Sequence, residues 1–139
     1  MPKIPQSIRR TVAIRACGYC EYCRCPEQYA TQSFTVEHIK PKHAGGETVV
    51  ENLALSCYGC NSHKHSKIKG LDLETRKKIA LYNPRLQVWS DHFEWSDDFT
   101  QIIGKTPCGR ATVDALHLNR FGVVNLRHLL RDANLHPPE

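Results

Sequence analysis

The adjacent residues Glu37 and His38 have side chains that could together hydrolyse a phosphodiester bond. An unperturbed imidazole has a pKa of about 6.5, so His38 can take a proton from water near neutral pH. The carboxylate of Glu37 offers oxygen ligands of the kind that Mg²⁺ prefers. Such hydrolysis needs a base that activates water and a cation that stabilises charge on the phosphate, and these two residues could supply both.

Asn61 and His65 could complete a site for that cation. Their spacing of four positions places them on one face of a helix. The amide oxygen of Asn61 suits Mg²⁺, whereas the imidazole of His65 widens the preference towards Mn²⁺ or another transition metal. We therefore expect Glu37, Asn61 and His65 to bind a catalytic ion.

Asn52 lies between these two groups in the sequence and cannot itself transfer protons. Its side-chain amide both donates and accepts hydrogen bonds. Two roles stay open at this point, because the amide could fix the backbone of the preceding loop or orient the imidazole of His38.

Two C-x-x-C pairs predict a separate zinc site. Each pair curls the backbone around a metal, and two pairs give the four thiolates of a tetrahedral structural site. The expected zinc ligands are Cys20, Cys23, Cys57 and Cys60. Cys17 and Cys25 are then spare thiols, and Cys108 has no predicted partner.

The elements expected around these residues are short. Hydrophobic periodicity and breaker residues predict a helix over 6–16, a strand over 33–39, a glycine-containing loop over 40–48, a strand over 53–56 and a helix over 60–67. In an ideal strand Glu37 and His38 point to opposite faces. Both can reach one site only if the strand twists near Pro41.

Beyond Gly70 the pattern predicts a helix over 71–81, a hairpin turn at 96–98, and helices over 109–116 and from 119 to about 130. Aromatic residues Trp89, Phe93 and Trp95 lie between these elements. We expect them to form the core of this region rather than to stack on nucleobases.

The charge of the chain fits a polyanionic partner. The formal net charge is +5, and the sequence pI is about 8.9. Lysines near the proposed site could hold a nucleic-acid backbone, namely Lys40, Lys42, Lys64 and Lys67. The sequence contains neither an apolar window of about 20 residues nor a secretory leader, so we expect a soluble, cytoplasmic protein without a membrane partner.

Together these residues resemble the HNH endonuclease family in its zinc-bound, four-cysteine, bacterial-type form. The resemblance covers about residues 17–68. It rests on the pattern Cys20-x-x-Cys23, Glu37-His38-Ile39-x-Pro41, Gly45-Gly46, Asn52-Leu53, Cys57-x-x-Cys60-Asn61-x-x-Lys64.

The resemblance implies an α+β fold with a ββα-metal (His-Me finger) nuclease core, stapled by the four-cysteine zinc site. An N-terminal helix and a C-terminal extension of helices and a hairpin would flank this core. The implied catalytic residues are His38 as general base, Asn52 as the structural asparagine and Asn61 as a metal ligand. Glu37 would help to bind the ion, although the family more often has Asp or His there. Many members also have histidine where this chain has Asn61, and His65 matches an extra helix histidine of colicin-like members.

We therefore expect one HNH nuclease domain over residues 1–139, with its core at about 17–69 and its extension at about 71–136. We expect the protein to be a Mg²⁺- or Mn²⁺-dependent endonuclease that hydrolyses DNA. Double-stranded DNA is the first candidate substrate, and RNA is the second. The alternative is a non-catalytic zinc module that binds nucleic acid or protein, which would not need Glu37, His38 and Asn61. The sequence does not indicate the cleavage specificity, the preferred metal, the oligomeric state or the biological role. It also does not distinguish nicking from double-strand cleavage.

Overall fold

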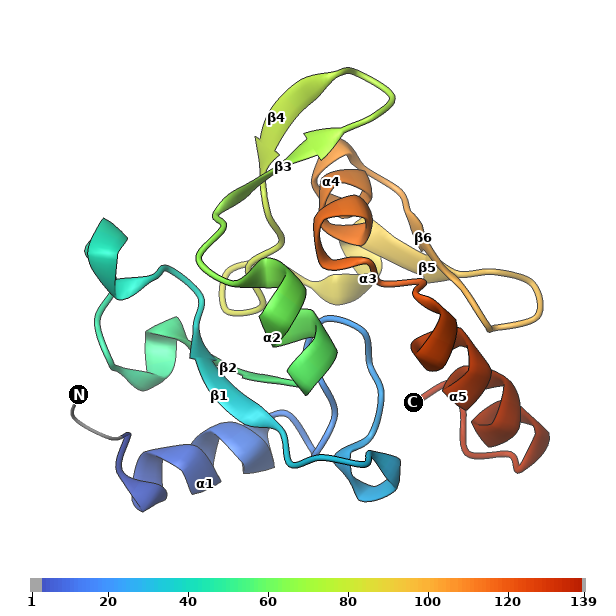
Figure 1. Cartoon of the computed structure of the whole chain (residues 1–139), viewed down its shortest axis with the longest axis horizontal. Helices are drawn as coiled ribbons and strands as arrows, with labels where there is room; N and C mark the ends of the chain where they lie inside the picture. Colours follow the sequence, from blue (N-terminus) through green and yellow to red (C-terminus); the bar gives the residue numbers. More distant parts are fainter. Residues whose placement is uncertain (1–3, 139) are drawn as a thin grey trace.

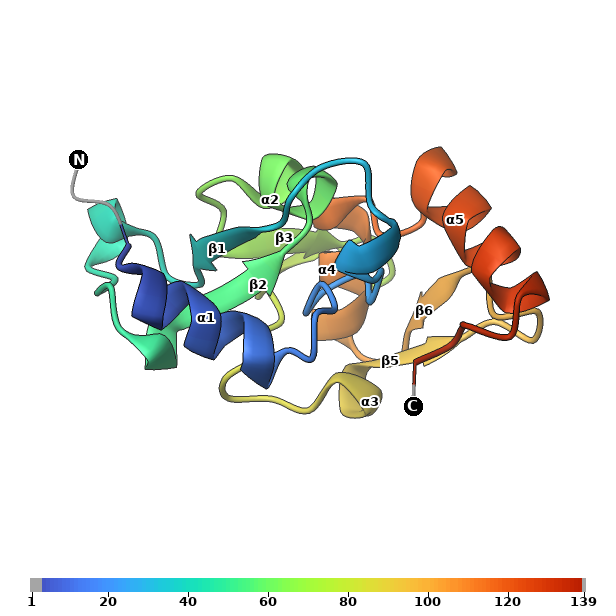
Figure 2. The same cartoon turned by 90° about the horizontal axis from the view of Figure 1, so that it is seen from below.

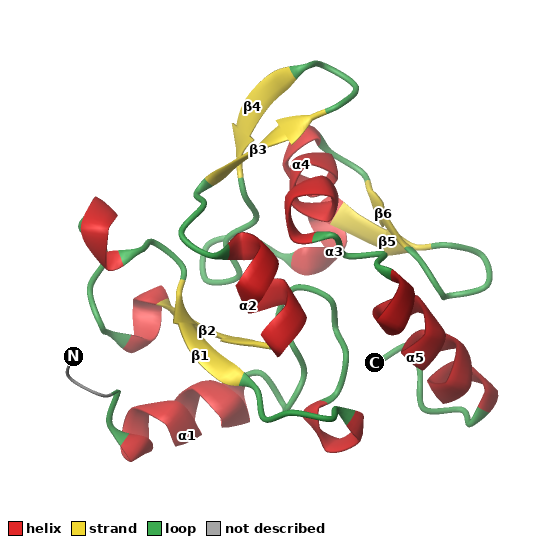
Figure 3. Ribbon diagram, viewed as in Figure 1, coloured by secondary structure: helices red, strands yellow, loops and turns green. Residues whose placement is uncertain are grey.

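A computed structural model describes residues 4–138 and shows small two-stranded sheets set among helices (Figures 1 and 3). The helices of this part of the chain are α1 (Gln6–Arg15), α2 (Tyr58–Lys64), α3 (Trp89–His92), α4 (Pro107–Leu116) and α5 (Phe121–Asp132). The strands pair as antiparallel hairpins: β1 (Thr35–His38) with β2 (Leu53–Ser56), β3 (Lys69–Asp72) with β4 (Lys77–Ala80), and β5 (Phe93–Trp95) with β6 (Ile102–Gly104). Short 3-10 helices occur at Glu27–Tyr29, Lys42–Ala44 and Val50–Asn52. None of the helices within residues 4–138 has the length and apolar character needed to cross a membrane.

Helix α1 packs against the β1–β2 hairpin, as Figure 2 shows from below. Val12 on the helix is fully buried and forms one apolar cluster with Val36, Leu53 and Leu55 of the hairpin. The expected helix and both expected strands are confirmed, with shifts of one or two residues at some ends. This packing holds β1, and with it His38, in a fixed position.

Helix α2 begins earlier than expected because Cys57 caps it. The Sγ atom of Cys57 accepts a hydrogen bond from the backbone N–H of Cys60 at 3.4 Å, which satisfies one of the free donors of the first turn. The helix ends at Lys64, since His65 adopts a positive φ of 49°. The predicted order of strand, loop, strand and helix is confirmed.

The helix expected over 71–81 is wrong, because this segment forms the β3–β4 hairpin that projects at the top of Figure 1. The side chain of Asp72 accepts hydrogen bonds from the turn at Glu74 and Thr75. Arg110 on α4 binds the same carboxylate with two hydrogen bonds of 2.9 and 3.1 Å. This long-range ion pair, which sequence periodicity does not show, anchors the hairpin to α4.

The C-terminal elements share a core with the cysteine-rich segment. The turn after Trp95 and the two last helices are confirmed, with α4 starting earlier and α5 ending later than expected. Phe93 is 1% exposed, and the indole N–H of Trp89 donates to the carbonyl of Tyr22 at 3.0 Å. One buried cluster joins these aromatics to the cysteines, which confirms that the aromatic residues form core.

Candidate active site and cysteine cluster

An open cleft of roughly 560 Å³ lies between β1 and the C-terminal half of α2. Residues predicted for the catalytic site meet here, and those that line it are Glu37, His38, Asn61 and His65. Glu37 pairs with Ala54 and His38 with Leu53 in the hairpin register, so their side chains leave opposite faces of β1. Both nevertheless line the cleft, because it runs along the open edge of this two-stranded sheet.

His38 is partly buried and makes one side-chain hydrogen bond. Its Nε2 atom lies 2.8 Å from the hydroxyl oxygen of Thr48. Burial lowers the pKa of His38 below its ordinary value, and the nearby cations of Lys42 and Lys64 lower it further. The imidazole is therefore neutral at neutral pH and has a lone pair that can accept a proton.

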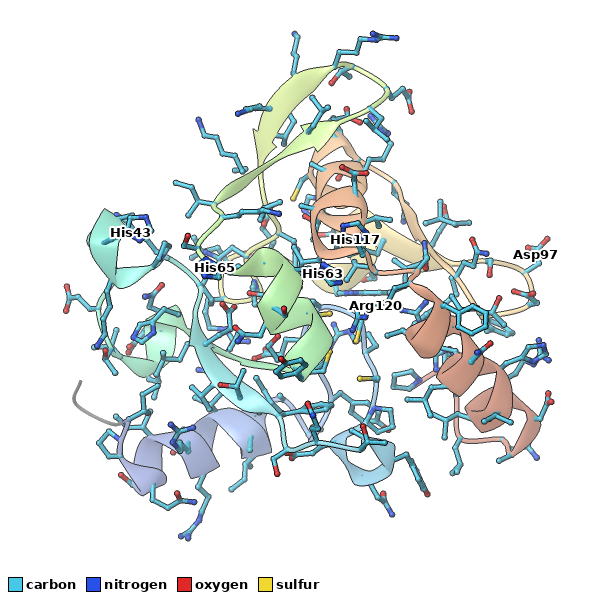
Figure 4. All side chains as sticks on the ribbon, viewed as in Figure 1. His43, His63, His65, Asp97, His117 and Arg120 are labelled. Atoms are coloured by element: carbon cyan, nitrogen blue, oxygen red, sulfur yellow. The ribbon has the colours of Figure 1, made fainter. Side chains whose placement is uncertain are left out.

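Asn61 and His65 approach the cleft from α2. The backbone N–H of His65 donates to the carbonyl of Asn61 at 2.8 Å, so the expected helical spacing is present even though His65 ends the helix. The Nδ1 atom of His65 lies 3.1 Å from the hydroxyl of Ser66. Figure 4 shows His65 on the side of α2 nearer β1 and His63 on the other side, next to His117.

Glu37 is held by two neighbours. The hydroxyl of Tyr22 donates to its Oε1 atom, and the ammonium group of Lys64 lies 3.1 Å from its Oε2 atom. Burial raises the pKa of Glu37, and Lys64 and Tyr22 act in the opposite direction. Both carboxylate oxygens of Glu37 therefore have a protein partner, although a carboxylate can accept about four hydrogen bonds or metal contacts in total.

The expectation that Lys64 binds a nucleic-acid backbone is wrong for this arrangement, because Lys64 is only 2% exposed. Its ammonium group also donates to the carbonyls of His38 and Ile39, at 3.4 and 3.0 Å. Lys64 thus fixes the end of β1 to α2. The other three lysines of the predicted set, Lys40, Lys42 and Lys67, are exposed.

The side chain of Asn52 makes its hydrogen bonds to the backbone of the intervening loop and makes none to His38. Its Oδ1 atom accepts from the backbone N–H of Lys40 at 2.9 Å, and its Nδ2 atom donates to the carbonyls of Lys40 and Glu47 at 3.0 and 2.9 Å. A Cβ atom at Gly46 would lie 1.7 Å from the Lys40 carbonyl oxygen, so only glycine fits there. Of the two roles left open for Asn52, these hydrogen bonds match that of fixing the loop backbone.

The four predicted cysteines converge on one point. Their ligand atoms all lie within 4.8 Å of one another, and the Sγ atoms of Cys23 and Cys57, one from each C-x-x-C unit, are 3.6 Å apart. All four side chains are buried. A zinc ion with Zn–S bonds of about 2.3 Å requires sulfur atoms about 3.8 Å apart at the corners of a tetrahedron. The cluster therefore fits a structural zinc ion.

Arg120, at the start of α5, lies against this cluster (Figure 4). Its guanidinium donates to the Sγ atoms of Cys57 at 3.2 Å and of Cys60 at 3.5 Å. Burial lowers the pKa of Arg120, but the thiolates outweigh burial, and the net pKa is raised. A Cβ atom at Gly59 would lie 2.5 Å from the guanidinium, so glycine leaves the space that Arg120 occupies.

A second arginine, Arg127 on α5, is 1% exposed and binds backbone around the cluster. It donates to the carbonyl of Leu118 at 2.7 Å and to that of Cys23 at 3.4 Å. Four thiolates and a zinc ion would carry a net charge of −2, and the buried Arg127 and the partly buried Arg120 would compensate such a charge.

Sequence reasoning missed several residues that shape the two sites. Thr48, Tyr22, Arg120 and Arg127 contact the predicted residues, and Cys25 packs in the same buried cluster as the four cysteines. Tyr22 lies between two predicted ligands, which is a weak signal. Arg120 lies about 60 residues along the chain from the cysteines that it contacts, so no local sequence pattern predicts these contacts.

Comparison with known proteins identifies the family of the central segment. Residues 20–67 match the model of the HNH endonuclease family, so this segment is an HNH domain and the resemblance is confirmed there. The chain is also similar to the Septu protein PtuB of Bacillus thuringiensis, with 33% identity over 104 residues, which is 73% of this chain and 37% of that relative. The chain thus spans a little over a third of the length of that relative. No solved structure matches the chain.

Proposed function

We propose that this protein is a divalent-ion-dependent endonuclease that hydrolyses DNA phosphodiester bonds in the cleft between β1 and α2. The observation that carries the proposal is that Glu37, His38, Asn61 and His65, which come from two elements, line one open cleft. The HNH match of the segment supports the reaction class. With its closed loop and buried cysteine cluster, the segment is proposed to be a ββα-metal core.

His38 acts as the general base in this proposal. If its Nε2–H donates to Thr48, the Nδ1 atom keeps a lone pair and takes a proton from the attacking water. The water oxygen bonds to phosphorus as the bond to the 3′ oxygen breaks, and the 3′ oxygen receives a proton from solvent. One water is consumed, and the products carry a 5′-phosphate and a 3′-hydroxyl.

Asn61, His65 and Glu37 are the residues that would hold the catalytic Mg²⁺ or Mn²⁺. This ion would stabilise the charge that develops on the phosphate and on the leaving oxygen. Lys64 neutralises part of the Glu37 charge, so Asn61 and His65 are expected to contribute relatively more to binding. In the same proposal, Cys20, Cys23, Cys57 and Cys60 bind zinc, which fixes the start of α2 next to Asn61.

A cleavage assay over a metal series tests this proposal. Zinc-loaded protein is incubated with supercoiled plasmid, linear duplex DNA or RNA, and Mg²⁺ or Mn²⁺ is varied. His65→Ala is expected to raise the ion concentration needed for half-maximal cleavage, whereas His63→Ala, which changes the same residue type on the other side of α2, is not. Binding of nucleic acid without cleavage in any metal would support the non-catalytic zinc module instead.

A further inference from the structure

A second hollow of roughly 660 Å³ lies beside the catalytic cleft, at the C-terminal end of α2. Ile39 and Lys40, which directly follow His38, line this groove, as do Lys64 and Lys67 from α2 and its C-terminal end. The groove continues to the foot of the β3–β4 hairpin at Lys69 and Ile79. Its volume lies within the range of about 300–1,000 Å³ found for ligand sites.

The charges around this groove have one sign. Among the described residues that line it, the charged ones are lysines and no carboxylate occurs. Lys40, Lys67 and Lys69 are exposed, and none of them takes part in an ion pair within residues 4–138. Unpaired cations around a groove attract an anionic chain.

The lining between the lysines is apolar. Leu81 and Tyr82 are buried, while Ile68 and Leu86 expose 46% and 82% of their surfaces. The flat faces of nucleobases are largely apolar, and covering them with exposed aliphatic side chains removes apolar surface from water. Paired bases in a duplex hide these faces in the stack and present only their edges. The combination of a cationic rim and an apolar lining therefore fits an unpaired strand better than a duplex.

We propose that this groove binds an unpaired nucleic-acid segment next to the scissile phosphate, with bases on Ile68 and Leu86 and phosphates on Lys40, Lys67 and Lys69. The inference rests on the proposed function, because the strand enters the groove from the His38 cleft. Both DNA and RNA have this chemistry, and the experiment separates them. An acidic, apolar protein segment is the competing occupant.

The test measures binding without catalysis. A labelled 12-nucleotide single strand, as DNA and as RNA, and the matching duplexes are titrated into zinc-loaded His38→Ala protein without added Mg²⁺ or Mn²⁺, over a range of salt concentrations. The groove variant is Lys67→Ala/Lys69→Ala. Its matched control is Arg10→Ala/Lys105→Ala, which removes the same charge at exposed residues outside the groove.

We expect the groove variant to bind the single strand more weakly and to reduce the slope of log affinity against log salt by about 1.4, at about 0.7 per lost phosphate contact. The control should leave that slope unchanged. Leu86→Ser should weaken single-strand binding at every salt concentration without changing the slope. The stronger single-strand binder, DNA or RNA, identifies the groove's ligand.

Equal affinities and slopes for the groove variant and its control would overturn the inference, and would leave a protein segment as the occupant. Cleavage by the wild-type protein is measured separately. If the wild-type protein cleaves nucleic acid but the groove variant binds the single strand as tightly as the control does, the groove proposal is refuted and the proposed function is not. If the groove variant binds the single strand more weakly but the wild-type protein cleaves in no metal, the proposed function is refuted and the groove proposal is not.

Discussion

The ammonium group of Lys64 lies 3.1 Å from the carboxylate of Glu37, and both side chains are almost completely buried. The pair joins the end of α2 to β1 one residue before His38. Because two hydrogen bonds from Lys64 also reach the carbonyls of His38 and Ile39, this contact determines where the candidate base lies relative to α2.

Loss of Lys64 should therefore destabilise the fold. Removing one partner of a buried ion pair costs about 3–5 kcal/mol, since the other charge stays buried without compensation. We expect a loss of this size in the unfolding free energy of Lys64→Met, measured with urea on zinc-loaded protein. Adding Glu37→Gln should recover part of it. Lys67→Met, at an exposed position, should change stability by no more than about 0.5 kcal/mol, and an equally small effect at Lys64 would refute the importance of the pair.

Arg120 should control how firmly the cysteine cluster retains zinc. Its guanidinium donates to two of the four sulfur atoms, and loss of such outer contacts typically weakens metal binding by about 10–100-fold. Arg120→Gln should release zinc faster to a chromogenic chelator. Arg131→Gln, which alters a partly buried arginine of the same helix that is paired with Asp132, serves as the control. Identical release rates for the two variants would show that Arg120 does not support the metal site.

Asn52→Ala should open the loop that follows β1. The substitution removes three hydrogen bonds to backbone groups, each with a net contribution of about 0.5–1.5 kcal/mol. We expect a stability loss of about 1.5–4.5 kcal/mol and slower cleavage with an unchanged pH profile, because Asn52 positions the loop and transfers no proton. Asn125→Ala on the exposed side of α5 is the control. A shifted pH profile would instead indicate direct contact with the reacting groups.

The pKa of His38 should respond to Lys42. The cation of Lys42 lowers this pKa, so Lys42→Ala should raise it toward the ordinary value of 6.5. A base works only when deprotonated, so the acid limb of cleavage should lie below pH 6.5 in the wild type and shift to higher pH in the variant. NMR titration of His38 in zinc-loaded protein without Mg²⁺ measures the shift directly. A pKa that falls or stays constant on removal of Lys42 would contradict the electrostatic account.

Local patterns predicted the parts of the fold that depend on neighbouring residues. The strand at Leu53–Ser56 follows from a short apolar run, and the cysteine cluster follows from two C-x-x-C spacings. The convergence of His38 and Asn61 followed from the family pattern, which encodes their arrangement in space.

The errors arise where a distant residue decides the outcome. The charged residues over 71–81 have helical spacing, yet the segment forms a hairpin, in which Asp72 pairs with Arg110 of α4. The sequence around Lys64 is typical of an exposed helix face, but Lys64 is buried because it pairs with the carboxylate of Glu37, 27 residues earlier. Neither partner can be identified from local periodicity, because ion pairs across the fold depend on the tertiary arrangement.

The most direct test of the central claim is the cleavage rate of His38→Ala beside wild-type protein, at equal zinc content and with the same Mg²⁺ or Mn²⁺ concentration. Loss of a general base slows a reaction by about 10²–10⁴-fold, and the account predicts a decrease in this range with the fold and the zinc retained. Equal rates for the two proteins would contradict the assignment of His38 as the base and of the cleft as the catalytic site.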